Sequence, residues 1–155
     1  MKHLVSSIVV VVGLGPAVGQ AIAQDHAVAT TVEECGACHM AFPPQLLPAR
    51  SWQKIMSGLA DHFGENAELA EPARAEITAF LVAHAADAPG TENGRLLLRG
   101  VDASAVPLRI TELPFWQAAH REIPAREFTS VKVKSAANCL ACHRGGGEEE
   151  SGERE

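Results

Sequence analysis

All four cysteines of the chain fall in two short motifs of one pattern. The motifs are Cys35-Gly36-Ala37-Cys38-His39 and Cys139-Leu140-Ala141-Cys142-His143. Two thiols three residues apart reach the two vinyl groups of one porphyrin, and the next residue, a histidine, then lies under the iron as its proximal ligand. The pattern predicts two covalently bound haem c groups with these attachment residues and iron ligands: Cys35, Cys38, Cys139 and Cys142, with His39 and His143 on the irons.

Two other interpretations of the cysteine pairs are a zinc site and a thioredoxin-like redox pair. A redox pair needs no histidine after its second cysteine, and the βαβ context of such a pair is missing from the sequence. Two complete motifs that use every cysteine therefore favour haem. If the cysteine pairs did not attach haem, the chain would instead be a metal-free or zinc-holding binding module.

Each iron also needs a sixth ligand from elsewhere in the chain. His62 lies at the edge of an apolar helix face, and His120 follows Trp116 by one helical turn and is near the second motif. We predict that His62 completes the first haem and His120 the second. Histidine on both sides lowers the reduction potential relative to methionine and histidine, and it leaves no open position for a substrate.

Three other side chains are of a type that could bind iron as a sixth ligand. Met40 adjoins His39, with Cα atoms only about 3.8 Å apart, so it cannot reach the opposite haem face. Met56 stays open as a ligand, although its place in an apolar stripe favours a core role. His84 also stays open, but it falls in the last turn of a predicted helix, where a histidine is favourable without any metal.

The elements that position these residues are predicted to be mainly α-helical, with little or no β-sheet. Apolar periodicity predicts helices over 52–63, capped by Ser51, over 72–86 and over 114–123. Thr30 or Thr31 is predicted to cap a short helix leading to Cys35, and Ser135 to cap a helix carrying the second motif. Prolines predict an extended stretch over 43–48. Residues 89–107 are predicted to be a linker with an extended piece at 96–98.

The first 23 residues have the features of a cleaved export signal. A short basic start precedes the apolar run from Leu4 to Val12, and Ala21-Ile22-Ala23 matches an A-x-A cleavage site. An uncleaved membrane anchor is the alternative, but glycines and a proline interrupt the apolar segment after Val12. We therefore predict a periplasmic protein without stable membrane insertion.

Charge is unevenly distributed along the chain, which carries a formal −6 in total and so is not a general nucleic-acid binder. Residues 95–144 hold eight Lys or Arg against four Asp or Glu, a formal +4. Within this stretch Lys132 and Lys134 are candidates for docking an acidic partner. Residues 145–155 are rich in Gly and Glu and are predicted to be a disordered acidic tail.

Several segments resemble the bacterial dihaem cytochrome c family usually abbreviated DHC. The similar segments, which together span about residues 33–144, are Glu34–Phe42 running on to Pro48–Trp52, Asp61–Ala67, Leu108–Thr111, Trp116 with His120–Ile123, and Ser135–Cys139. The resemblance implies two small haem-binding lobes, the first similar to a class I cytochrome c, and it places distal histidines at His62 and His120. Together with the segments described above, the resemblance predicts five parts of the chain: a signal peptide at 1–23, a first lobe at 24–88, a linker at 89–107, a second lobe at 108–144 and a tail at 145–155.

The expected function is that of a monomeric one-electron carrier rather than an enzyme. The resemblance implies a membrane b-type cytochrome as electron donor and a small soluble high-spin, oxygen-binding cytochrome c as acceptor. The alternative is a small dihaem enzyme, a peroxidase or reductase, which needs one five-coordinate iron and distal acid–base groups.

Overall fold

The computed structural model describes residues 16–91 and 93–143, with residues 16–22 described by their backbone alone. The start of the predicted signal peptide, residues 1–15, and the predicted tail at 145–155 lie outside the described residues. Over the described residues the chain is mainly helical and has no β-strand, which confirms the predicted fold class. Its elements, in chain order, are α1 (Pro16–Gly36), η1 (Pro44–Leu46), α2 (Ala49–Met56), η2 (Leu59–Asp61), α3 (Ala73–Ala83), α4 (Gly94–Leu97), η3 (Ile110–Glu112), α5 (Pro114–Ala119), α6 (Ala125–Phe128) and η4 (Cys139–Ala141), where η denotes a 3-10 helix.

The helix before the first motif is longer than predicted. α1 runs through the predicted cleavage point after Ala23 and continues to Gly36, so neither Thr30 nor Thr31 caps its start. Their hydroxyl groups instead donate to the carbonyls four residues back, Thr30 to His26 at 3.0 Å and Thr31 to Ala27 at 2.7 Å. A threonine inside a helix commonly satisfies its hydroxyl in this way.

The second helix is displaced toward the N-terminus relative to the prediction over 52–63. α2 begins after Pro48 and ends at Met56, because the chain turns at Gly58 into η2. Ser51 is therefore inside the helix and fully buried rather than at its cap. The prolines before it form the 3-10 helix η1 as well as extended backbone. α3 closely matches the predicted 72–86 helix, with Pro72 immediately before its first residue.

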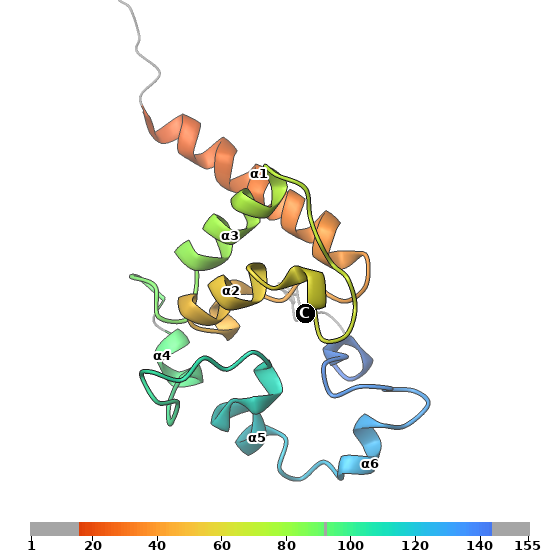
Figure 1. The fold of residues 1–155 in the computed structure, drawn as a ribbon. Helices are drawn as coiled ribbons and strands as arrows, with labels where there is room; N and C mark the ends of the chain where they lie inside the picture. The colour runs from red at the N-terminus through yellow and green to blue at the C-terminus, as the bar shows by residue number, and fades with distance from the viewer. Residues whose placement is uncertain (1–15, 92, 144–155) are drawn as a thin grey trace, which may run out of the picture.

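One apolar core joins the first and second halves of the chain. α1 and α3 pack side by side above α2, and α4, α5 and α6 follow beneath it (Figure 1). Trp52 lies in the core, and its indole N–H donates to the Pro44 carbonyl at 2.7 Å. Leu113, from the second half, is 1% exposed and packs into the same core. Among the described residues, the buried members of this core cluster are Leu47, Trp52, Met56, Leu59, Ile77, Leu81, Ala85 and Leu113.

Residues 89–107 are held against the first half by specific contacts. The Arg50 guanidinium donates to the carbonyls of Ala105 at 2.5 Å and Asp102 at 3.2 Å. The predicted extended piece at 96–98 is wrong, because residues 94–97 form α4. Gly94 lies so near Ala86 that an added Cβ would stand 2.1 Å from the Ala86 carbonyl oxygen, and only glycine permits this approach. The boundaries of the two lobes stay a prediction.

The second half consists of short helices joined by turns. Pro114 begins α5, as the sequence predicted, but α5 ends at Ala119 and His120 follows it directly. Ser135 does not begin a helix over the second motif. Its hydroxyl oxygen accepts a hydrogen bond from the Ala137 N–H at 3.1 Å, which closes a turn, and only the single 3-10 turn η4 follows.

Candidate haem-binding sites

The first motif lies at the C-terminal end of α1. Cys35 is half-buried and Cys38 is exposed. Burial raises the pKa of the Cys35 thiol, and the negative charge of Glu34 raises it further. The Nδ1 atom of His39 lies 2.6 Å from the carbonyl oxygen of Met40. A carbonyl only accepts hydrogen bonds, so Nδ1 carries the proton and Nε2 keeps a free lone pair. This arrangement is typical of a metal-binding histidine.

His62 follows η2 directly and faces His39. The two imidazole centroids are 6.1 Å apart, with an interplanar angle of 23°. Burial lowers the pKa of His62, and the neighbouring His39 and Arg109 lower it further. The lowered pKa favours the neutral form of His62, which is the form that binds a metal.

The second motif follows a turn of the chain rather than a long helix. Cys139 begins η4, and burial raises the pKa of its thiol. His120, at the C-terminal end of α5, brings its ring to 6.0 Å from that of His143, at an interplanar angle of 76°. The Nδ1 atom of His120 lies 2.8 Å from the Trp116 carbonyl oxygen, so its Nε2 also keeps a free lone pair.

Both histidine pairs have the separation that a haem iron requires. Two imidazoles that bind one metal from opposite sides, each through a nitrogen at about 2 Å, have ring centres about 6 Å apart. Among residues 16–91 and 93–143, no three His, Cys, Asp or Glu side chains lie close enough together to hold a metal ion. Each pair therefore offers the two ligands that a porphyrin iron takes from protein, whereas a structural zinc site takes four.

The surroundings of the second pair are apolar and suit a porphyrin face. A small cavity of about 40 Å³ is lined by both histidines and by four large apolar side chains: Trp116, Ile123, Phe128 and Val133. The Trp116 and His120 rings stack with centroids 4.3 Å apart. Trp116 thus braces the imidazole while leaving its other nitrogen free.

The competing ligands lie elsewhere. His84 ends α3 with its Nδ1 2.9 Å from the Phe80 carbonyl, much as His120 ends α5, but its Nε2 lies 3.0 Å from the side-chain nitrogen of Gln24. Met56 is 4% exposed within the apolar core, as its position in the stripe indicated. His26 is on the surface and pairs with Glu76.

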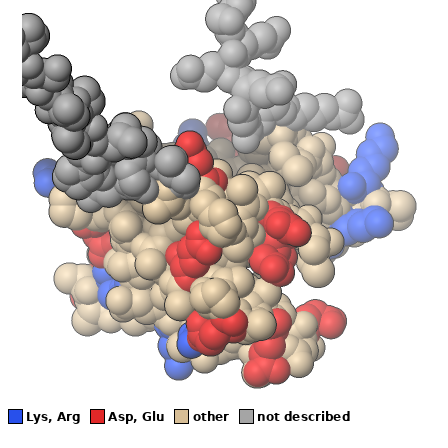
Figure 2. Space-filling view, turned by 90° about the horizontal axis from the view of Figure 1, so that it is seen from above, with Lys and Arg blue, Asp and Glu red and all other residues tan. Residues whose placement is uncertain are grey.

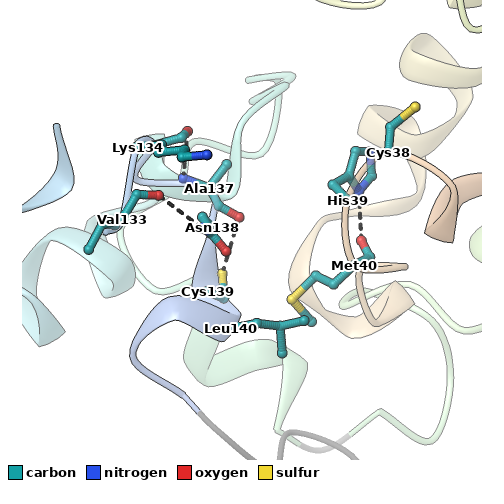
Figure 3. Close-up of a pocket in the computed structure, with 10 residues that line it drawn as sticks. Cys38, His39, Met40, Val133, Lys134, Ala137, Asn138, Cys139 and Leu140 are labelled. Atoms are coloured by element: carbon teal, nitrogen blue, oxygen red, sulfur yellow. Dashed lines mark hydrogen bonds between the residues drawn. The ribbon is translucent and has the colours of Figure 1, made fainter. Parts of the chain in front are cut away.

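The two motifs are brought together across a larger cavity of about 310 Å³. Residues 38–40 line one side and residues 133–140 line the other, and the Met40 side chain extends toward Leu140 (Figure 3). The four cysteines form no disulfide, so all four thiols are available for haem attachment. No sequence pattern predicts this juxtaposition, because it depends on how the second half of the chain folds back on the first.

Comparison with known proteins identifies the group that these residues hold. The family model described as dihaem cytochrome c matches residues 31–150. The chain belongs to the dihaem cytochrome c family. It therefore carries two haem c groups, as the two motifs predicted.

Solved structures of other dihaem cytochromes c have the same fold. A diheme cytochrome c from Rhodobacter sphaeroides is 48% identical with a TM-score of 0.68, and the match covers 74% of this chain and 89% of that one. A diheme cytochrome c from Shewanella baltica is 38% identical with a TM-score of 0.59, over 76% of this chain and 80% of that one. No curated protein sequence matches the chain.

None of the described helices of this dihaem cytochrome c is both long and apolar enough to cross a membrane. Two residues beside the first site were not singled out for a role there by the sequence. Arg109 and Phe63 lie in the segments Leu108–Thr111 and Asp61–Ala67 that carry the family resemblance, but neither was assigned a role in the site. The structure stacks the Arg109 guanidinium over the Phe63 ring, with its carbon 4.1 Å from the ring centroid.

Proposed function

We propose that this dihaem cytochrome c is a periplasmic one-electron carrier in which each iron has two histidine ligands. The pairs are His39 with His62 and His143 with His120. The observation that carries the proposal is the ring separation of 6.1 Å in one pair and 6.0 Å in the other, each beside a complete attachment motif.

Bound haem c supplies an iron that changes oxidation state by one electron. The four cysteines fix the two porphyrins by thioether bonds, and the hydrogen-bonded Nδ1 groups of His39 and His120 fix the orientation of two of the imidazoles. Because a histidine faces each motif, neither iron keeps a free position for a substrate. This favours a carrier over a peroxidase or reductase, which needs such a position.

The arrangement of the motifs supports electron exchange within the molecule. Cys38 and Cys139 line the same cavity of about 310 Å³, so the edges of the two porphyrins attached there would be neighbours. A chain with adjacent haems accepts an electron at one surface and delivers it at another.

The proposed partners are a membrane b-type cytochrome as donor and a small soluble high-spin cytochrome c as acceptor. The family resemblance in the sequence motivates both. Val131 is 90% exposed between Ser130 and Lys132, which provides an apolar contact beside positive charge near the second motif. The proposed location is the periplasm, on the basis of the signal-peptide pattern at residues 1–23.

A redox titration of the purified holoprotein tests the carrier function. The holoprotein should take up two electrons per chain in two one-electron steps, with low-spin spectra in both oxidation states. It should not turn over hydrogen peroxide at steady state. A high-spin haem together with peroxide turnover would contradict the proposal and favour the enzyme.

A further inference from the structure

The turn that carries His62 has an unfavourable backbone conformation. His62 and Glu65 exchange two backbone hydrogen bonds, N to O distances 2.7 and 3.2 Å, around a two-residue turn made by Phe63 and Gly64. Both turn residues have positive φ, 57° for Phe63 and 99° for Gly64. Glycine adopts this left-handed region freely, but a bulky aromatic residue does so only when its surroundings hold it there.

Arg109, from the second half of the chain, contacts Phe63 and stabilises this conformation. Its guanidinium carbon lies 4.1 Å above the Phe63 ring, within the range of a cation–π contact. Arg109 immediately precedes η3, and Leu113, just after η3, is fixed in the core with 1% exposure. Glu112 lies one turn on, with a carboxylate oxygen 4.0 Å from the Arg109 Nε. Arg109 is thus positioned independently of the turn that it covers.

Two further ring contacts connect Phe63 to the imidazole pair of the first site. The Phe63 ring packs edge-on against the His62 ring, with centroids 4.8 Å apart, and the His62 ring faces His39. The Phe63 ring also contacts Arg109. A movement of Phe63 out of its left-handed conformation would therefore carry His62 away from His39.

We propose that Arg109 is a positioning residue for His62: by stacking on Phe63 it holds the turn that presents the His62 imidazole to the first haem. The second half of the chain thereby controls the sixth ligand of the haem in the first half. This inference rests on the proposed function, in which His62 binds the iron. Because Arg109 lies over the ring that packs against His62, its charge would also favour the reduced state of the iron that His62 holds.

The test uses the holoprotein with Arg109→Gln, Arg109→Lys and, as a matched control, Arg121→Gln. Arg121 is an exposed arginine whose contacts are with Ala118 and Glu122 on its own segment. The readouts are the rate of carbon monoxide binding to each reduced haem and the two midpoint potentials. The spectrum of the His62→Ala holoprotein with carbon monoxide serves as the reference for the first haem.

Arg109→Gln should speed carbon monoxide binding at the first haem by about two- to fivefold, the population change that corresponds to a surface cation–π contact. It should also lower the potential of that haem alone. Arg109→Lys keeps the charge and should restore the potential. Effects no larger than those of Arg121→Gln on both readouts would overturn the proposal.

Phe63→Leu provides a second variant, which keeps a bulky side chain that disfavours positive φ but removes the aromatic ring. Its effect on carbon monoxide binding should resemble that of Arg109→Gln, and the double variant should add nothing further, because both changes break one contact. Fully additive effects would overturn the proposal. A wild-type first haem that binds carbon monoxide freely would contradict the proposed function instead.

Discussion

Trp52 supports the core through both its ring and its N–H group. It is 6% exposed, and its indole donates to the Pro44 carbonyl at 2.7 Å. Trp52→Phe should lower the free energy of unfolding of the holoprotein by about 1–3 kcal/mol, because a buried carbonyl loses its donor. Denaturant unfolding followed by circular dichroism measures this. The exposed neighbour variant Gln53→Ala should change the value by less than about 0.5 kcal/mol, and equal losses in the two variants would contradict the role of Trp52.

The residues of the candidate sites differ in how far the sequence could predict them. The attachment cysteines and their histidines are predictable because the porphyrin itself imposes their spacing. His62 and His120 could be selected from their helix-edge positions, and the structure brings each within about 6 Å of a motif histidine. The role of Phe63 could not be predicted, since no pattern signals an aromatic residue at positive φ held by a cation 46 residues away.

At the scale of elements, α1 and α3 are joined by a pH-dependent contact. The Nδ1 atom of His26 lies 2.5 Å from a carboxylate oxygen of Glu76, and this hydrogen bond and the charge of Glu76 raise the pKa of His26 above 6.5. A pKa raised on folding means that the protonated form is stabilised. The contribution to stability is therefore complete below pH 6.5, the unfolded value, and is lost as the pH rises through the folded value.

His26→Ala should consequently lower the melting temperature of the holoprotein at about pH 5.5 and have little effect at about pH 9. Glu76→Gln, which removes the partner charge, should show the same dependence. Thermal unfolding at the two pH values measures both variants. A loss of equal size at both pH values would show that His26 acts through packing and not through its charge.

The limits of the helices were harder to predict than their existence. The helix face at 52–63 was identified by its apolar period, yet α2 ends at Met56, because the local turn at Gly58 outweighs the periodicity. Thr31 and Ser51 were predicted as caps from residue type alone. Both lie inside helices, where burial against neighbouring elements decides their position.

At the scale of the whole molecule, the surface that carries Lys132 and Lys134 is positively charged, whereas the protein as a whole is acidic. Figure 2 shows acidic side chains spread over one face, with Lys and Arg at its margins. We expect electron transfer to an acidic acceptor to slow with added salt, since the Debye length falls from about 10 Å at 0.1 M to about 3 Å at 1 M. Lys132→Glu with Lys134→Glu should slow it about tenfold or more at low salt.

Stopped-flow measurement of the second-order rate constant tests this docking prediction. Both haem potentials should stay near their original values in the double variant. Lys54→Glu with Arg95→Glu, two exposed residues on α2 and α4, is the matched charge reversal. If this control slows the reaction as much as the lysine variant does, the effect belongs to net charge and not to the surface beside the second motif.

The central claim is that a histidine occupies the sixth coordination position of each iron. Binding of carbon monoxide to the reduced holoprotein tests this claim most directly. The account predicts that both wild-type haems bind carbon monoxide only slowly, because a histidine must first leave the iron. One haem should bind it rapidly in His62→Ala, one in His120→Ala, and none in His84→Ala. Rapid binding by a wild-type haem, or a rapidly binding haem in His84→Ala with none in His62→Ala, would contradict the account.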